Sequence, residues 1–208
     1  PYPAPFEPTE VLGGAASVEV IFSPDSSIQS LTDLIVDAPN GCEIDIETPG
    51  FDSWGSCSYE HDGCAGCSVS DMKEEDFPIF PALLNTKHQK GCAIRIVTNN
   101  YNTPTCDGEI TPLDFLSLNG IEVHMFTTTT FMHVKYIAVR NGSSSATPMR
   151  KAAVSSINFS QDSFMQNREA GVIVTGGDGG AGDVLLNRYH SVFDFDFGQG
   201  FRHVVNQT

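Results

Sequence analysis

Hydrophobic and polar residues alternate in short runs along the first half of the chain. The alternation over residues 16–22 (ASVEVIF) and 42–48 (CEIDIET) predicts two strands, because successive side chains of a strand point to opposite faces. Between them, apolar residues at helical spacing predict a helix from Ser26 or Ser27 to about Asp37. The acidic residues of the second run are the usual mark of a strand with one face in water.

The alternation of strands and helices continues along the chain. An amphipathic helix is expected to start near residue 80, since Pro78 and Pro81 restrict where it can begin. Further strands are expected at residues 92–98, 121–126, 133–139, 151–157 and 170–175, with one helix that begins at Pro112 and a last helix over 181–193. The order β-α-β-α-β-α-β, followed by β-β-β-α, predicts an α/β domain with a mixed central β-sheet flanked by helices.

Two segments fall outside this pattern. Residues 1–15, which open on the Pro-rich PYPAPFEP, are interpreted as an N-terminal extension with a processed or truncated start, so that the domain spans residues 16–208. Residues 49–71, rich in Gly, Ser and Cys, are expected to form an irregular insert. The insert holds Trp54, a candidate substrate-binding residue, and is either a wall of a substrate cleft or a surface loop pinned by disulfides.

The chain is strongly acidic, with Lys+Arg 11 against Asp+Glu 26 and a formal net charge of −15. Binding to long nucleic acids or to anionic membranes needs a basic surface, so these classes of function are disfavoured. A local basic pocket is still compatible with this charge. No apolar run approaches the roughly 18–20 residues that span a bilayer, and no stable membrane insertion is expected.

The number of cysteines is even, and the six are Cys42, Cys57, Cys64, Cys67, Cys92 and Cys106. In an acidic chain poor in Lys this favours disulfides, and hence secretion or the lumen of a vesicular or lysosomal compartment. Cys42 and Cys92 each open a predicted strand and are expected to staple those strand ends to the insert. The CxxC pair of the insert, with His61 beside it, leaves a structural zinc site as the alternative.

Three N-x-S/T sequons begin at Asn141, Asn158 and Asn206. Of these, Asn141 and Asn206 are the candidate glycosylation sites. Such sequons arise often by chance, so they add only a little to the argument for an oxidising compartment.

Side chains suited to phosphoryl transfer follow one another along the second half of the chain. His133 and Lys135 are two residues apart at the start of a predicted strand, so alternation places them on one face. Asn158 follows the next predicted strand, and Glu169 opens the one after it. An imidazole to attack phosphorus, an ammonium and an amide to hold phosphate oxygens, and a carboxylate to orient the ring are thus expected at one edge of the sheet.

These residues resemble the signature of the phospholipase D superfamily. His133-x-Lys135 is similar to its HxK motif, residues 155–158 (SSIN) to its GSxN element, and residues 167–169 (NRE) to its NxE element. The combination is specific, whereas HxK alone is not. The resemblance extends over about residues 16–197, because the opening strand–helix–strand, the third strand and the closing helix also match.

The resemblance implies a role for each of these side chains. His133 is the expected nucleophile and forms a phosphohistidine. Lys135 and Asn158 are expected to bind the phosphate oxygens, Ser156 to support the substrate pocket, and Glu169 to orient the imidazole. The family needs no metal, and no cofactor is implied.

The chain departs from the family pattern at two positions. Arg140 stands where the HxKxxxxD signature has its acidic residue, and Ser155 stands where the GSxN element has its Gly. The acidic residue is mainly structural in the family, so its loss does not exclude activity.

The active site of the family needs two HxK halves, and this chain has one in a suitable setting. His88-Gln-Lys90 has the letters of the motif, but it lies at the end of a predicted helix with no SxN or NxE element after it. The expected partner is a second phospholipase D-like half, either an identical chain or the other part of a cleaved precursor.

The predicted function is a phosphodiesterase that acts through a phosphohistidine on a phospholipid or nucleic-acid phosphodiester. The alternative is a catalytically degenerate phospholipase D-like scaffold or binding subunit, which Arg140 and the single half-site also permit. A third hypothesis, a zinc-dependent hydrolase built on the insert, lacks an HExxH motif.

Overall fold

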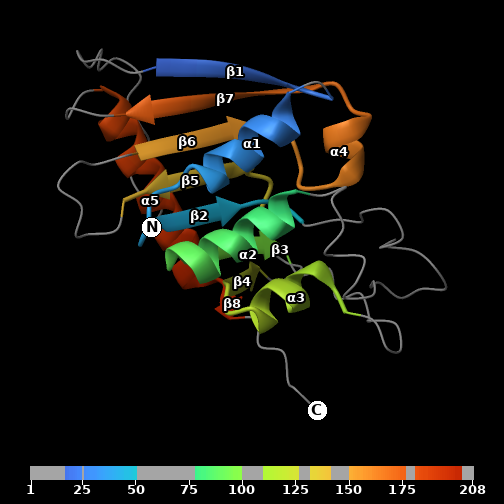
Figure 1. The fold of residues 1–208 in the computed structure, drawn as a ribbon, viewed down its shortest axis with the longest axis vertical. Coiled ribbons are helices and arrows are strands. Elements are labelled where there is room, and N and C mark those ends of the chain that lie inside the picture. Colours follow the sequence, from blue (N-terminus) through green and yellow to red (C-terminus); the bar gives the residue numbers. More distant parts are fainter. Residues whose placement is uncertain are drawn as a thin grey trace.

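The computed structural model describes residues 17–24, 26–50, 78–99, 110–126, 132–141, 150–176 and 181–202. At their centre lies a mixed sheet of eight strands in the order β1-β7-β6-β5-β2-β3-β4-β8 (Figure 1). The strands are β1 (Ser17–Ser23), β2 (Glu43–Glu47), β3 (Ala93–Asn99), β4 (Glu122–Phe126), β5 (Tyr136–Arg140), β6 (Arg150–Ser155), β7 (Glu169–Gly176) and β8 (Phe201–Arg202). Helices lie on both faces of the sheet, which confirms the α/β fold class.

One edge of the sheet collects strand ends from both halves of the chain. β2, β3 and β4 are parallel, whereas β5 and β7 run antiparallel to the strands beside them. The C-terminal ends of β1, β2, β3, β4 and β6 therefore meet the N-terminal ends of β5 and β7. The short helix α4 (Gln161–Met165) lies beside this edge, which we call the α4 edge (Figure 1).

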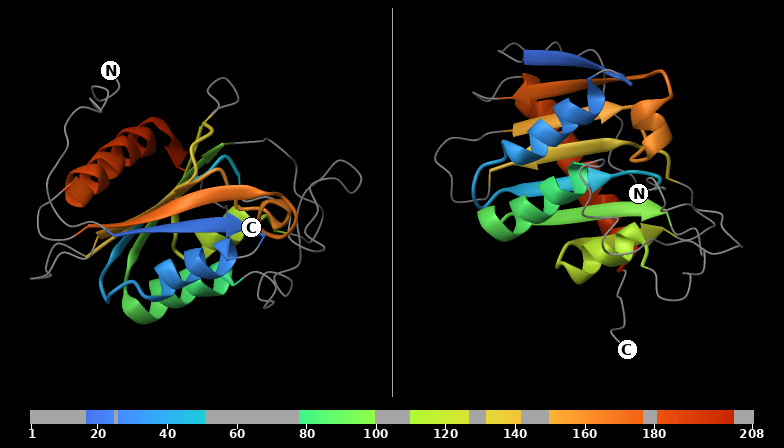
Figure 2. Two further views of the ribbon diagram at one scale, coloured as in Figure 1. Left: turned by 90° about the horizontal axis from the view of Figure 1, so that it is seen from above. Right: turned by 45° about the vertical axis from the view of Figure 1, so that its right-hand side comes forward.

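The other helices divide unequally between the two faces. α1 (Ser27–Val36), α2 (Ile79–Lys90) and α3 (Pro112–Leu118) cover one face, and α5 (Ala181–Gln199) crosses the opposite face (Figure 2). α3 begins at the predicted proline, and Thr111 caps it through a capping box. No helix in the described parts of the chain is long and apolar enough to cross a membrane.

The larger part of the core lies between the sheet and α1 and α2. Ile44 and Ile46 of β2 and Ile94 of β3 are buried there, against Leu31 of α1 and Leu83 of α2. Full burial of an Ile or Leu side chain is worth about 1.5–3 kcal/mol. This apolar layer fixes the two central parallel strands, and with them the position of the α4 edge.

The opposite face of β2 differs from what its sequence predicts. Its acidic alternation is typical of a solvated face, yet Asp45 and Glu47 are each 0% exposed beneath α5. The prediction is wrong because a helix from the far end of the chain covers these carboxylates. Arg95 and His190 also supply hydrogen bonds to Asp45 that water would otherwise give.

The strands and helices expected from the sequence all have counterparts within a few residues. The last helix, expected over 181–193, extends to Gln199. Among the strands the largest shift is that of β5, expected over 133–139 and found at Tyr136–Arg140. The segment before it stays outside the ladder because the backbone of Met132 bonds to the side chain of Asn99. The sequence analysis misses α4 and β8, which are too short to show a periodic pattern.

Cys42 and Cys92 form a disulfide, with their Cα atoms 4.5 Å apart. They directly precede β2 and β3, whose first residues Glu43 and Ala93 are paired in register. The expectation that each cysteine joins its strand end to the insert is therefore wrong, because two parallel strands that start side by side bring them together. The bond lies at the end of the sheet opposite the α4 edge, and it fits an oxidising compartment.

Several sequence predictions fall on residues outside the described ranges. These are the N-terminal extension, the insert beyond Gly50 with Trp54, the cysteines Cys57, Cys64, Cys67 and Cys106, and the sequon at Asn206. They stay predictions.

Replacing both Cys42 and Cys92 by Ala should destabilise the fold. The disulfide closes a loop with a sequence separation of 50 residues. In the chain-entropy model, a crosslink of this length raises the free energy of the unfolded chain by about 4 kcal/mol. We expect urea unfolding under non-reducing conditions to show a loss of about 2–4 kcal/mol. A double variant as stable as the wild-type chain would contradict the assigned pairing.

Candidate active site

Three strand ends bring the predicted site residues to the α4 edge. Lys135 directly precedes β5, Ser156 directly follows β6, and Glu169 is the first residue of β7. Backbone hydrogen bonds join these ends, because Ser155 N donates to Lys135 O (3.1 Å) and Ser156 N donates to Ala170 O (3.0 Å). The antiparallel order β5-β6-β7 thus places the three segments side by side.

His133 and Lys135 are in direct contact. The Lys135 Nζ atom lies 3.0 Å from both Nδ1 and Nε2 of His133, and it donates a hydrogen bond to the His133 carbonyl (3.1 Å). The ammonium is thus held against the imidazole ring. His133 is exposed whereas Lys135 is 5% exposed, so an accessible imidazole stands beside a buried cation.

Glu169 acts on the charge of Lys135. Burial lowers the pKa of Lys135, and the negative charge of Glu169 works against this effect. Asn167 Nδ2 donates to Glu169 Oε1 (3.3 Å) and helps to hold the carboxylate. Glu169 therefore favours the charged form of the ammonium next to His133, where it can attract an anionic phosphate.

Ser156 and Asn158 lie on the segment that leaves β6. The buried side chains of Ile157 and Phe159 anchor this segment in the core. Ser156 Oγ donates to Ala170 O (3.4 Å) and accepts from Ala170 N (3.3 Å), so it ties the segment to β7. The Oδ1 atom of Asn158 is buried and has no hydrogen-bond partner within the described ranges.

Asn99 is a positioning residue that the sequence analysis missed. Its side chain donates from Nδ2 to Met132 O (2.8 Å) and accepts at Oδ1 from Met132 N (2.9 Å). Asn99 is 4% exposed and ends β3, so this pair of bonds fixes the backbone one residue before His133. The sequence feature that could have pointed to this role is the place of the Asn, directly after the expected apolar strand 92–98.

An open cleft with a volume of ≈ 660 Å³ adjoins the α4 edge. Its lining includes the apolar Phe22 and Pro24 and the polar Ser156, Arg168 and Glu169. Arg168 is the one positively charged residue in this lining. The volume of the cleft is in the range of small-molecule sites. It can therefore take a small apolar or anionic group beside Ser156 and Glu169.

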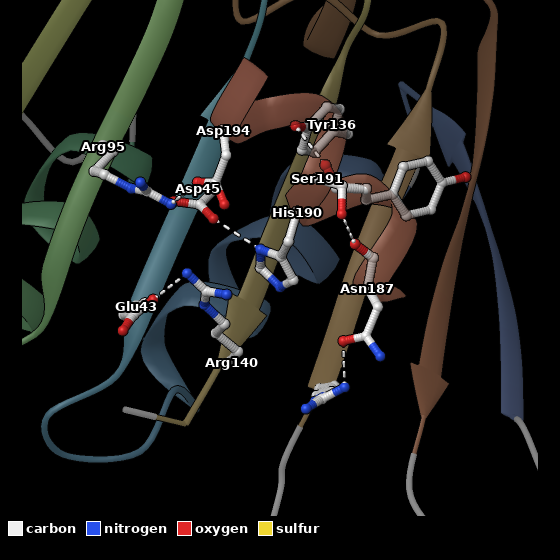
Figure 3. Close-up of polar contacts among 11 residues, drawn as sticks. Glu43, Asp45, Arg95, Tyr136, Arg140, Asn187, His190, Ser191 and Asp194 are labelled. Carbon is white, nitrogen blue, oxygen red and sulfur yellow. Dashed lines mark hydrogen bonds and ion pairs between the residues drawn. The ribbon is translucent and has the colours of Figure 1, made fainter. Parts of the chain in front are cut away.

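Arg140 lies at the end of β5 that is remote from His133. Seven residues of extended chain, roughly 20 Å, separate the two. The guanidinium of Arg140 forms an ion pair with Glu43 on β2, opposite which it is paired in register (Figure 3). The departure from the acidic residue of the signature is thus a cross-strand charge pair far from the candidate site.

No cluster of three or more His, Cys, Asp or Glu side chains suited to a metal ion occurs in the part of the chain that the structure describes. The zinc hypothesis concerns the insert, which lies outside those residues, as does Trp54. Asn141, a candidate glycosylation site, directly follows β5.

Comparison with known proteins gives the family. Residues 66–194 match the family described as "Cardiolipin synthase, PLD-like domain". Because the match spans more than half of the chain, the chain belongs to this family of phospholipase D-like domains. No curated protein matches the chain.

Solved structures share the fold at low sequence identity. Nuc from Salmonella typhimurium, a phospholipase D family member, is 18% identical with a TM-score of 0.63 and covers 92% of this chain and 100% of its own. NucT from Helicobacter pylori is 11% identical with a TM-score of 0.54, covering 91% and 100%. Phosphatidylserine synthase from Haemophilus influenzae Rd KW20 is 12% identical with a TM-score of 0.53, covering 90% of this chain and 40% of that one.

Arg140→Asp, which restores the acidic residue of the signature, should destabilise this chain. The change removes an ion pair whose side chains are 30% and 31% exposed and places two carboxylates opposite each other on β5 and β2. We expect a loss of about 1 kcal/mol in urea unfolding. Adding Glu43→Arg should recover most of it, and a gain in stability from Arg140→Asp alone would contradict the assigned pair.

Proposed function

We propose that this chain is one half of a phosphodiesterase that works through a phosphohistidine, with the second half supplied by another chain. The observation that carries this proposal is the contact of Lys135 with the exposed imidazole of His133. The charge of Glu169 at the same edge and the family membership of the chain add to it.

In the proposed first step, a ring nitrogen of His133 attacks phosphorus and a P–N bond forms. The P–O bond to the leaving alcohol breaks, and its electron pair stays on that oxygen, which takes a proton from an acid on the other half. Lys135 and Asn158 hold the two non-bridging oxygens. Their donors are worth more in the transition state than in the ground state, because negative charge grows on those oxygens.

In the second step, water attacks phosphorus from the side that the alcohol left. The group that gave its proton in the first step takes one from this water, the P–N bond breaks, and its electron pair returns to the imidazole of His133. The product is a phosphomonoester. Glu169 favours the charged form of Lys135 and is proposed to orient His133.

The need for a second half follows from the chemistry of the first step. His133 uses a nitrogen lone pair to attack phosphorus, so it cannot donate the proton that the leaving oxygen needs at the same moment. A second acid must face it across the α4 edge. A two-fold pair of identical chains meets this requirement, and so does the other part of a cleaved precursor.

The substrate class that we propose is a phospholipid head group or the end of a nucleic acid. The cleft offers Phe22 and Pro24 to an apolar or aromatic group and Arg168 to an anion. The net charge of −15 disfavours long polyanions. The disulfide supports a secreted protein or one in the lumen of a vesicular or lysosomal compartment.

Replacing His133 by Ala should abolish turnover of a simple phosphodiester such as bis(p-nitrophenyl) phosphate by the assembled protein. Rapid quench of the wild-type protein in alkaline detergent should trap an acid-labile phosphorus label on one histidine, and peptide mapping at alkaline pH should place it at residue 133. The assay is run in EDTA, because the proposed chemistry needs no metal. Turnover near the wild-type rate in the alanine variant would overturn the assignment.

Lys135→Ala should reduce turnover more than Lys135→Arg, since an arginine keeps the charge beside the imidazole but not the compact geometry. Removal of one charge-stabilising donor costs about 10²–10³ in kcat, and the arginine variant should recover part of this. Lys151, on β6, provides the matched control. Equal loss in Lys135→Ala and Lys151→Ala would point to net charge rather than to the site.

Mixing experiments test the two-chain site. If the partner is an identical chain, equal amounts of His133→Ala and wild-type chains that exchange subunits should lower the activity of the wild-type chains by about half, because mixed pairs lack one imidazole. If the partner is a different chain, native mass spectrometry should show a particle of two unequal chains. A fully active particle of 22.5 kDa would exclude both, and an assembled particle without turnover would favour a binding subunit.

A further inference from the structure

The layer between α5 and the sheet holds more acid than base. Asp45 and Asp194 meet Arg95 and His190 there (Figure 3). With Glu47 and Asp196 beside them, and with the Glu43–Arg140 pair set aside, four carboxyl groups stand against two basic groups around Asp45 and Glu47. If every group were charged, this layer would carry two more negative than positive charges. Apart from Asp194, whose side chain is 52% exposed, the carboxyl groups are buried, so the excess has little access to water.

The part of the layer around Asp45 is well compensated. Arg95 Nε donates to Asp45 Oδ1 (2.8 Å), and His190 Nδ1 donates to Asp45 Oδ2 (2.8 Å). Burial raises the pKa of Asp45, but these two partners outweigh it and lower the pKa. Arg95 also pairs with Asp194 (2.9 Å), so neither basic group is left to neutralise another carboxylate.

Glu47 has no basic partner among the described residues. Its side chain is 0% exposed, and both carboxyl oxygens lack a hydrogen-bond donor within the described ranges. The residue opposite it on β3 is the apolar Val97. On β5 it faces Tyr136, whose hydroxyl donates to Tyr189 O (3.3 Å) on α5.

Besides Tyr136, the ionisable neighbour of Glu47 is another carboxyl group, Asp196 on α5, which is 4% exposed. Two ionised carboxylates are acceptors only and repel each other, whereas one protonated carboxyl group donates to its neighbour. Burial, followed by the charge of Asp196, raises the pKa of Glu47 from 4.5 to about 8, and the hydroxyl of Tyr136 opposes this rise only in part. One proton between the two groups therefore supplies the donor that the layer lacks.

We infer that Glu47 and Asp196 form a buried proton-binding site that fastens the C-terminal half of α5 to the sheet. Folding then takes up one proton at this site. The inference concerns the docking of α5 and does not depend on the proposed phosphodiesterase activity.

The direction of the pH dependence follows from proton counting. In the unfolded chain Glu47 titrates at its ordinary value of 4.5, and in the folded chain at about 8. Between these values the folded chain holds one proton more, so the stability from this site is complete below the lower value and is lost as the pH rises through the upper one. The unfolding constant rises about tenfold per pH unit in this window and no further above it.

The Glu47–Asp196 site lies next to the candidate active site. Glu47 is the last residue of β2 and is paired with Tyr136, which directly follows Lys135. Loss of the proton would put a second negative charge between α5 and these strand ends. A chain built in this way is most stable in an acidic compartment.

Urea unfolding of wild-type protein and of Glu47→Gln from about pH 5.5 to about pH 8.5 tests the inference. Gln has the shape of a protonated Glu and brings its own donor, so we expect the variant to lose about one proton of linkage, a factor of about ten per pH unit. It should also be more stable than the wild-type chain at the alkaline end. Hydrogen exchange at about pH 8.5 should show α5 better protected in the variant, relative to α1 in the same sample.

Asp196→Asn provides an independent test, and it should reduce the slope of stability against pH, as Glu47→Gln does. Glu43→Gln is the matched control, because it lies on the same strand with its side chain 31% exposed and has Arg140 as its partner. It should shift the stability by a similar amount at every pH and leave the slope unchanged. An unaltered slope in both Glu47→Gln and Asp196→Asn would overturn the inference.

Discussion

The pairing of β5 between β2 and β6 is the constraint on which the candidate site depends. Its antiparallel register with both neighbours brings the start of β5 to the edge where β2 and β6 end. The bond from Ser155 N to Lys135 O then joins the segment that carries His133 to the segment that carries Asn158. A slip of one residue in this strand would turn Lys135 to the other face of the sheet and away from Asn158 and Glu169 on the neighbouring segments.

The two faces of the sheet are stabilised by different interactions. The face under α1 and α2 is apolar, and burial of its side chains explains its stability without further partners. The face under α5 mixes aromatic residues with charges, and each charge needs a partner because burial of an unpaired ion is costly. Arg95 forms an ion pair with Asp45, and its guanidinium also lies over the ring of Phe193, 4.8 Å from the centroid. Docking of α5 therefore depends on protonation, whereas docking of α1 and α2 does not.

The sequence could predict the elements because most of them are long enough to show a period of two or of 3.6 residues. It could also predict that His133, Lys135, Asn158 and Glu169 come from consecutive strand ends. It could not predict the pairing of Cys42 with Cys92, since this needs the knowledge that β2 and β3 start side by side. The same limit applies to the buried carboxylates of β2 and to the bonds from Asn99, because in each case the partner comes from another part of the chain.

Arg140 shows why position in the strand matters more than a letter of a motif. The two ends of β5 have different surroundings. The first end follows His133 and Lys135 at the α4 edge, whereas Arg140 at the last end pairs with Glu43 at the opposite edge. A charge at the far end acts over roughly 20 Å and through other charged groups, so its effect on the imidazole is largely screened. Its strong interaction is with the residue across the strand pair, and there an arginine opposite Glu43 is the stabilising choice. An acidic residue at this position would need a different cross-strand partner. Arg140 in place of the acidic residue therefore reflects the pairing of β5 with β2 and not the chemistry at His133.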